Sequence, residues 1–115
     1  MNRPWQITNE QEWEELRRDI VECARGILNG SVGLTEGSRS LSALRQTVRA
    51  ESDADFRVFI AIMSETDRFP VGDVRELWNP DALAHYDAER LAEERRWRLE
   101  AEVACKNILA KFENA

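Results

Sequence analysis

The sequence predicts an all-α protein of four or five helices, with an N-terminal helical hairpin packed on a long C-terminal helix. With 115 residues, the chain is expected to form a single helical domain spanning residues 1–115. Apolar residues recur every three or four positions along most of the chain, which is the period of a helix with one buried face. Only residues 56–63 fit a strand equally well, and a lone strand would leave its backbone N–H and C=O groups unpaired.

The first helix is expected to begin near Thr8 or Asn9 and to stop at Gly30. Either polar side chain can accept hydrogen bonds from the free N–H groups of the first turn, and glycine readily adopts the left-handed conformation that ends helices. Residues 1–8 are expected to be extended, with Trp5 and Ile7 over the core. The apolar face of the helix consists of Trp13, Leu16, Ile20, Cys23, Ala24 and Ile27.

The second helix is expected to be capped by Ser31. Gly37 lies inside it and predicts a close approach of two helices, because no side chain separates the backbones there. Its apolar positions are Val32, Leu34, Leu41, Leu44 and Val48. Its solvated side is expected to carry Arg39, Arg45 and Arg49.

The most apolar segment, residues 56–63, is expected to be a helix that fills the centre of the molecule. Ser52 or Asp53, in the acidic linker before it, can cap this helix. Residues 64–69 are expected to form a turn, because Pro70 disfavours the helical conformation in the residue before it. Pro70 can then open a short helix that ends near Trp78.

The long C-terminal helix is expected to run from Asn79 to about Phe112. Asn79 can cap it, and Pro80 suits the first turn because its missing N–H loses no hydrogen bond there. Arg90 and Glu94 interrupt its apolar stripe, so its middle is expected to be exposed, bent or covered by a partner. The stripe itself consists of Leu83, Tyr86, Trp97, Ala101, Ala104, Ile108 and Phe112.

Charge and hydropathy restrict the function. The formal net charge of −6 argues against nucleic acid as a partner, because binding to phosphates needs basic side chains. The same charge favours attraction to a basic protein. No stretch approaches the ~18 consecutive apolar residues of a membrane helix, and the N-terminus shows no secretory signal. We therefore expect no membrane contact and a cytoplasmic location.

No cofactor, metal site or enzymatic activity is predicted. Cys23 and Cys105 lack the paired spacing of zinc ligands and are expected to be buried, reduced thiols. His85, the single histidine, could act as a base oriented by Asp81 or Glu89 one helical turn away. No motif for a serine or cysteine nucleophile accompanies it, so a surface position is the simpler interpretation.

The polar segment from Ser64 to Trp78 is the main candidate binding site, because loops on a rigid scaffold often carry recognition. The structural alternative is that its polar side chains bond to backbone groups of the turn, with Arg75 paired to Glu65, Asp67 or Asp73. The candidate binding residues of this segment are Glu65, Asp67, Asp73, Arg75 and Trp78.

Arg90 and Glu94, on the long helix, are the other two candidate binding residues. Two copies related by a two-fold axis could form a homodimer, in which Arg90 and Arg95 of one copy meet acidic residues of the other. Those acidic residues are Glu93 and Glu94. In the intramolecular alternative, Arg90 and Glu94 bond to each other or to the preceding turn.

Two stretches of the sequence resemble those of a known group of proteins. Residues 27–34 (ILNGSVGL) continue into residues 37–45 (GSRSLSALR), and residues 64–78 (SETDRFPVGDVRELW) are followed by Pro80 and by Ala82-Leu83. Together they resemble a family of small, uncharacterised bacterial all-helical domains, and they are similar to some immunity proteins encoded beside secreted toxins. The resemblance covers roughly residues 20–112, implies a bacterial cytoplasmic setting, and supplies no catalytic residues.

The expected function is therefore that of a non-enzymatic, acidic protein-binding module. In its most specific form it is an immunity protein that inhibits a basic bacterial toxin, such as a nuclease. The alternative is a self-associating structural or adaptor protein. A toxin gene beside the gene for this chain would favour the first.

Overall fold

The computed structural model describes residues 3–113, and within them it contains helices and no strand. The predicted all-α class and the predicted packing of an N-terminal hairpin on a long C-terminal helix are confirmed. The elements are α1 (Glu10–Asn29), α2 (Leu34–Thr47), α3 (Ala54–Thr66), the 3-10 helix η1 (Gly72–Leu77) and α4 (Pro80–Glu113).

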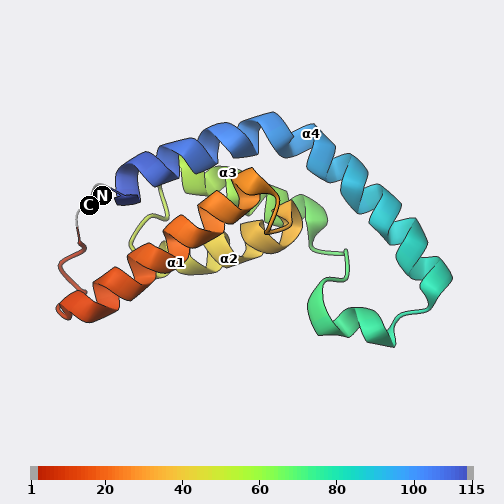
Figure 1. Cartoon of the computed structure of the whole chain (residues 1–115), viewed down its shortest axis with the longest axis horizontal. Helices are drawn as coiled ribbons and strands as arrows, with labels where there is room; N and C mark the ends of the chain where they lie inside the picture. Colours follow the sequence, from red (N-terminus) through yellow and green to blue (C-terminus); the bar gives the residue numbers. More distant parts are fainter. Residues whose placement is uncertain (1–2, 114–115) are drawn as a thin grey trace.

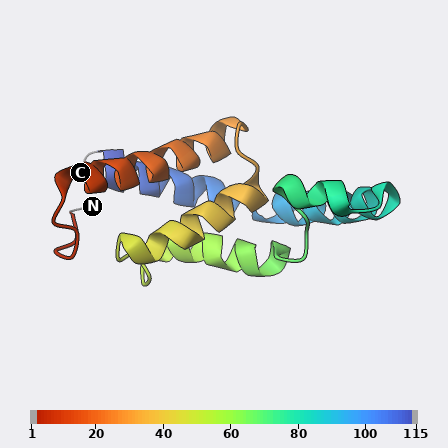
Figure 2. The ribbon, with the colours of Figure 1, turned by 90° about the horizontal axis from the view of Figure 1, so that it is seen from below.

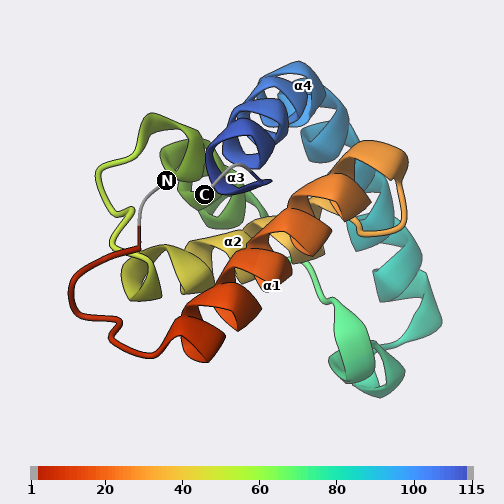
Figure 3. The same ribbon diagram turned by 60° about the vertical axis from the view of Figure 1, so that its left-hand side comes forward.

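Helices α1, α2 and α3 form a compact body, and the C-terminal half of α4 lies across it (Figure 1). Figure 3 shows α1 and α2 side by side as an antiparallel pair, with α3 between α2 and the end of α4. The N-terminal half of α4 continues beyond the body, and η1 lies beside it (Figure 2). We call this projecting part, residues 72–91, the arm. It accounts for the elongated shape of the molecule, whose principal extents are 48, 28 and 23 Å.

Aromatic and branched side chains from α3 fill the centre of the body, as predicted. Phe56, Phe59 and Ile62 are fully buried, and they lie on one helical face because they recur at intervals of three residues. The Phe56 ring packs edge-on against Phe112 of α4, with ring centroids 5.9 Å apart. Trp13 of α1 contacts the same Phe112 ring at 6.2 Å, so one cluster joins three helices.

Four predicted helix boundaries are confirmed. Asn9, Asp53 and Asn79 each accept hydrogen bonds from backbone N–H groups of the turn that follows. Gly30 ends α1 in the left-handed conformation, with φ of 84°. These signals are local, because each cap bonds to groups two or three residues away.

Gly37 brings α1 and α2 into close approach, also as predicted. A methyl group placed on Gly37 would lie 2.6 Å from two side-chain carbons of Ile27, which is too short for a van der Waals contact. The neighbouring Cys23 thiol lies 3.6 Å from the Gly37 carbonyl oxygen. Glycine is therefore required at this crossing for the observed packing.

Three local predictions were wrong. Ser31 does not cap α2, because the helix begins only after Gly33, and Gly33 has no side chain for that role. Trp5 does not lie over the core, since it is 84% exposed, although Ile7, predicted with it, is buried. The turn after α3 begins at Asp67 rather than at residue 64: Pro70 lies too far along the chain to restrict Thr66, whose hydroxyl donates to the Ile62 carbonyl within the helix.

Charged side chains from distant segments bind the helix ends of the body. Arg17 of α1 donates to the Phe112 carbonyl at the end of α4, at 2.8 Å. Arg39 of α2 donates to the Thr66 and Phe69 carbonyls at the end of α3, at 3.1 and 2.9 Å. The prediction that Arg39 is simply solvated is thus wrong. Carbonyl groups at helix C-termini lack intrahelical partners and carry partial negative charge, which is why guanidinium groups bind there.

Candidate functional site

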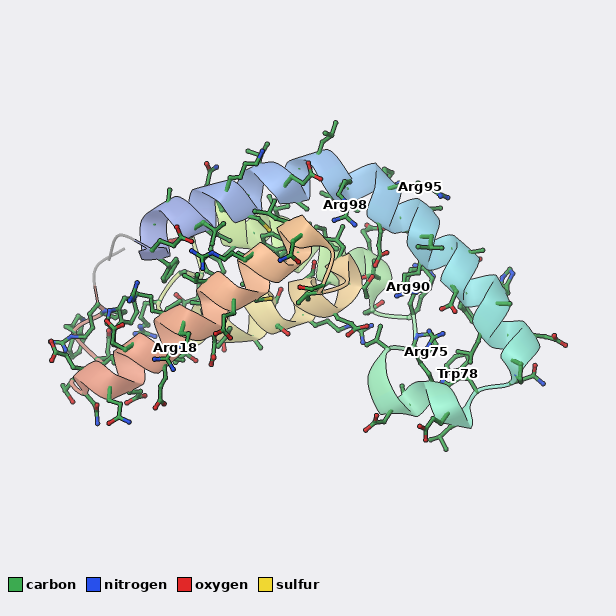
Figure 4. The ribbon with its side chains drawn as sticks, viewed as in Figure 1. Arg18, Arg75, Trp78, Arg90, Arg95 and Arg98 are labelled. Atoms are coloured by element: carbon green, nitrogen blue, oxygen red, sulfur yellow. The ribbon has the colours of Figure 1, made fainter. Side chains whose placement is uncertain are left out.

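The arm carries most of the predicted binding residues and an exposed apolar cluster that we call the tip: Val74, Leu77 and Trp78. Leu77 has 87% of its surface exposed, although leucine usually contributes to a core. Val74 and Trp78 are also exposed. Figure 4 shows Trp78 in the projecting arm, next to Arg75 and on the side of η1 that faces α4. Three exposed apolar side chains thus lie within five residues of the chain, and clustered exposed apolar residues often mark an interaction site.

A bidentate ion pair between Arg75 and Asp87 holds η1 against α4. The two terminal nitrogens of Arg75 donate to the two carboxylate oxygens of Asp87, both at 2.7 Å. Arg75 also donates to the Pro70 carbonyl at 3.1 Å. The hydrogen bonds from Arg75 lower the pKa of the Asp87 carboxyl group, and those same bonds raise the pKa of Arg75. The expected partners of Arg75 in the preceding turn were therefore wrong, because the partner comes from the long helix.

Aromatic rings in edge-on contact connect the arm to the body. The Trp78 ring packs edge-on against Tyr86 at 5.4 Å, and Tyr86 packs against Phe69 at 6.4 Å. Phe69 is buried where α3 leads into the arm. This chain of rings, together with the Arg75–Asp87 pair, gives the tip a defined position relative to the core.

Arg90 and Glu94 lie where the arm meets the body. The Glu94 carboxylate is only 8% exposed and accepts hydrogen bonds from the Thr35 backbone N–H and hydroxyl, at 3.1 and 2.8 Å. Arg90 lies 3.7 Å from Asp87, on the same side as Arg75 (Figure 4). The Glu94 carboxylate is thus engaged within the chain, on the face of α4 that the body covers. It is not presented to a second copy.

Glu65 and Asp67 lie outside the arm, whereas Asp73 belongs to η1. Glu65 lies 3.9 Å from Arg96, a long ion pair between exposed side chains. Asp67 contributes its backbone carbonyl to Arg39, at 3.3 Å. Within the described residues, the Asp73 side chain forms no hydrogen bond or ion pair. Of the seven predicted residues, the structure brings Asp73, Arg75 and Trp78 together on the arm, with Arg90 and Glu94 at its base.

Sequence reasoning missed Val74 and Leu77. Both belong to a six-residue 3-10 helix, which is too short to show a periodic apolar face. The sequence contains one hint that these two apolar residues could be exposed: they stand among acidic residues, between Pro70 and Pro80.

His85 and the two cysteines are the other candidates for chemistry in the sequence. His85 lies on the surface, 69% exposed, with its ring nitrogen 3.2 Å from Glu89. Burial raises the pKa of the Cys23 and Cys105 thiols to about 11 and about 12, so both stay protonated and weakly nucleophilic at neutral pH. Within residues 3–113, no group of three or more acidic, cysteine or histidine side chains could hold a metal ion.

None of the helices in the described part of the chain is both long and apolar enough to cross a membrane. We also compared the chain with family models, with curated proteins and with solved structures, and none of these comparisons found a match.

Proposed function

We propose that this chain is a non-enzymatic protein-binding module whose arm tip enters an apolar pocket of a basic partner. The observation that carries the proposal is the exposure of Leu77 and Trp78 on an arm in which Arg75 and Asp87 hold η1 against α4. A few large side chains at the centre of an interface usually supply most of its binding free energy, and tryptophan is prominent among them. A tip that is already ordered loses little conformational entropy when it binds.

Acidic side chains around the tip support the choice of a basic partner. Asp73, Glu76 and Asp81 lie within four residues of Leu77, and inside the described range none of their carboxylates forms an ion pair. The nearest basic residue, Arg75, is neutralised by Asp87. Together with the net charge of −6, these carboxylates would steer a positively charged protein toward the tip.

The most specific form of the proposal is inhibition of a bacterial toxin. The acidity of the chain and its resemblance to immunity proteins support this form. A basic nuclease would have to place an apolar pocket, rimmed by lysine or arginine, over the tip. The test is calorimetric titration of the protein with the toxin-like product of a neighbouring gene.

Two matched variants sharpen that titration. Leu77→Glu should weaken binding by about 30-fold or more, which is the loss expected when a central anchor is removed. Leu99→Glu makes the same change at a leucine that is 78% exposed on the other side of α4, so its affinity should equal that of the wild type. Equal affinities for wild type and Leu77→Glu would overturn the role of the tip. Absence of binding by the wild type would overturn toxin inhibition.

A further inference from the structure

The outer face of α4 carries a second exposed apolar surface, on the side opposite the core. Leu99 and Val103 are one helical turn apart and are 78% and 59% exposed, whereas Ala101 and Ile108 on the inner side are fully buried. This part of α4 is the convex top of the arch in Figure 1. A shallow groove between α3 and α4 is lined there by Asp55, Val58, Leu99, Glu100, Val103 and Ala104.

Two charged residues of opposite sign flank Leu99 on the same side of the helix. At 3.6 residues per turn, Arg95 is rotated by about 40° from Leu99 around the helix axis, and Glu102 by about 60° in the same direction. Arg95 precedes Leu99 by four residues and Glu102 follows it by three. Figure 4 shows Arg95 pointing away from the body. In the part of the chain that the structure describes, neither side chain forms a hydrogen bond or ion pair.

We propose that two copies of this chain pair through these outer faces, with the two α4 helices antiparallel and a two-fold axis passing beside Leu99. Such an axis is perpendicular to the plane that contains both helices, so the second helix runs in the opposite direction. The side that carries Arg95 and Glu102 faces the same way in both copies. Leu99 of one copy then meets Leu99 of the other, and Arg95 of each copy meets Glu102 of the other. The pairing is self-complementary in charge, and it brings the two exposed Leu99 side chains together.

The charges favour a second copy of the chain, rather than an unrelated protein, as the partner that binds the outer face of α4. An unrelated partner would need its own acidic and basic groups in this arrangement, whereas an antiparallel copy supplies them by symmetry. Of the two acidic residues in the pairing predicted from the sequence, Glu93 and Glu94, the second is already bonded to Thr35 within the chain. Two convex helices touch over a limited area, so the dimer belongs with small, weak interfaces that form at high protein concentration.

The proposed dimer does not depend on the proposed function, but it would extend it. The axis through the top of the arch directs the two arms to opposite ends of the dimer (Figure 1). Each dimer would then present two tips, and a partner with two sites would bind with higher avidity than a single tip allows.

Sedimentation equilibrium over a range of concentrations tests the dimer. The wild type should show a reversible monomer–dimer equilibrium, and Leu99→Glu should remain monomeric at the same concentrations. Leu77→Glu is the matched control and should dimerise like the wild type, which separates this surface from the tip. A wild-type protein that stays monomeric up to millimolar concentration would overturn the proposal, as would a dimer that Leu99→Glu leaves intact.

Charge reversal tests the register of the two helices. Arg95→Glu places two acidic residues in each symmetric contact and should raise the dimer dissociation constant by roughly tenfold at low salt. Adding Glu102→Arg to that variant should restore the dissociation constant to within about threefold of wild type, since the pairs form again with reversed sign. Thermal melts of dilute samples show that each variant folds. A double variant no tighter than the single one would overturn the antiparallel register.

Discussion

Glu94 of α4 caps the N-terminus of α2 through its side chain. The first N–H groups of a helix have no partner inside it, and the N-cap of α2 is Gly33, which has no side chain to offer. The Glu94 carboxylate supplies the missing acceptor from 59 residues away and places negative charge at the positive end of the helix. A carboxylate that is 8% exposed is tolerated because Thr35 gives it two hydrogen bonds.

Removing this cap should destabilise the fold. Glu94→Ala leaves the buried Thr35 N–H and hydroxyl without an acceptor, so the free energy of unfolding should fall by about 1–3 kcal/mol. Urea denaturation measures this value. Glu94→Gln is the matched variant, and it should lose less because its amide oxygen can still accept a hydrogen bond from Thr35. A loss below about 0.5 kcal/mol for Glu94→Ala, the size of an ordinary surface substitution, would contradict the capping role.

Phe59 is the clearest single test of the core. Its side chain is completely buried at the centre of α3, so Phe59→Ala should lower the free energy of unfolding by about 3–5 kcal/mol through lost burial and a new cavity. Val74→Ala removes apolar atoms from an exposed position and should change stability by less than about 0.5 kcal/mol. The two midpoints in chemical denaturation give the comparison. A Phe59→Ala protein as stable as the wild type would contradict the assignment of this ring to the core.

At the scale of elements, η1 depends on its contacts with α4. A 3-10 helix of six residues has poor hydrogen-bond geometry and little intrinsic stability. The Arg75–Asp87 pair and the Trp78–Tyr86 ring contact hold it in place. The arm is thus a short, weak element fixed to a long, strong one, and its order should be sensitive to single substitutions at that contact.

Asp87→Asn should loosen the arm without unfolding the body. An amide cannot accept the two charge-assisted hydrogen bonds that Arg75 donates to the carboxylate. Hydrogen exchange followed by mass spectrometry should therefore be faster for residues 72–78 and unchanged for α3. Asp73→Asn removes a carboxylate without a partner from η1 itself and should leave both rates at the wild-type values. Unchanged exchange in Asp87→Asn would show that the ring contacts alone hold η1.

At the scale of the whole molecule, one lysine joins the start of α3 to the end of α4. Lys111 donates to Asp53 and Asp55, both at 2.6 Å, and Asp53 is also the N-cap of α3. Burial alone would raise the pKa of Asp53, but the hydrogen bonds from Lys111 and from the Phe56 N–H outweigh it, so the pKa is lowered from 3.8. Burial alone would lower the pKa of Lys111, but its bonds to both carboxylates produce a net rise above 10.5.

This connection predicts a pH dependence of stability. The lowered pKa of Asp53 adds stability above its unfolded value of 3.8, and this contribution is lost as the pH falls through the lower folded value. Asp53→Asn keeps an acceptor for the cap and removes the titrating group. The difference in stability between wild type and Asp53→Asn should therefore shrink as the pH is lowered from about 5 to about 2. Thermal melts across this range measure it, and a difference independent of pH would contradict the ion pair.

Much of the fold follows from the sequence because its determinants are local. The caps Asn9, Asp53 and Asn79 bond to groups two or three residues away, and a helical period shows which face of a segment is apolar. The spacing of residues 56–63 fitted a strand as well as a helix, and the helix was favoured because a lone strand would leave its backbone groups unpaired. The same logic failed for Ser31, where a suitable capping residue was present but the helix began later.

The tertiary structure alone decided which polar side chains are bound and which apolar ones are free. Glu94 interrupts an apolar stripe in the sequence, and only the packing of α4 on α2 shows that it is a cap. Arg75 could have paired with several nearby carboxylates, but the fold places Asp87 of the long helix closest to it. The exposure of Leu77 depends on η1 projecting beyond the body. Sequence spacing determines contacts within a few residues along the chain, whereas contacts between distant segments depend on how the helices pack.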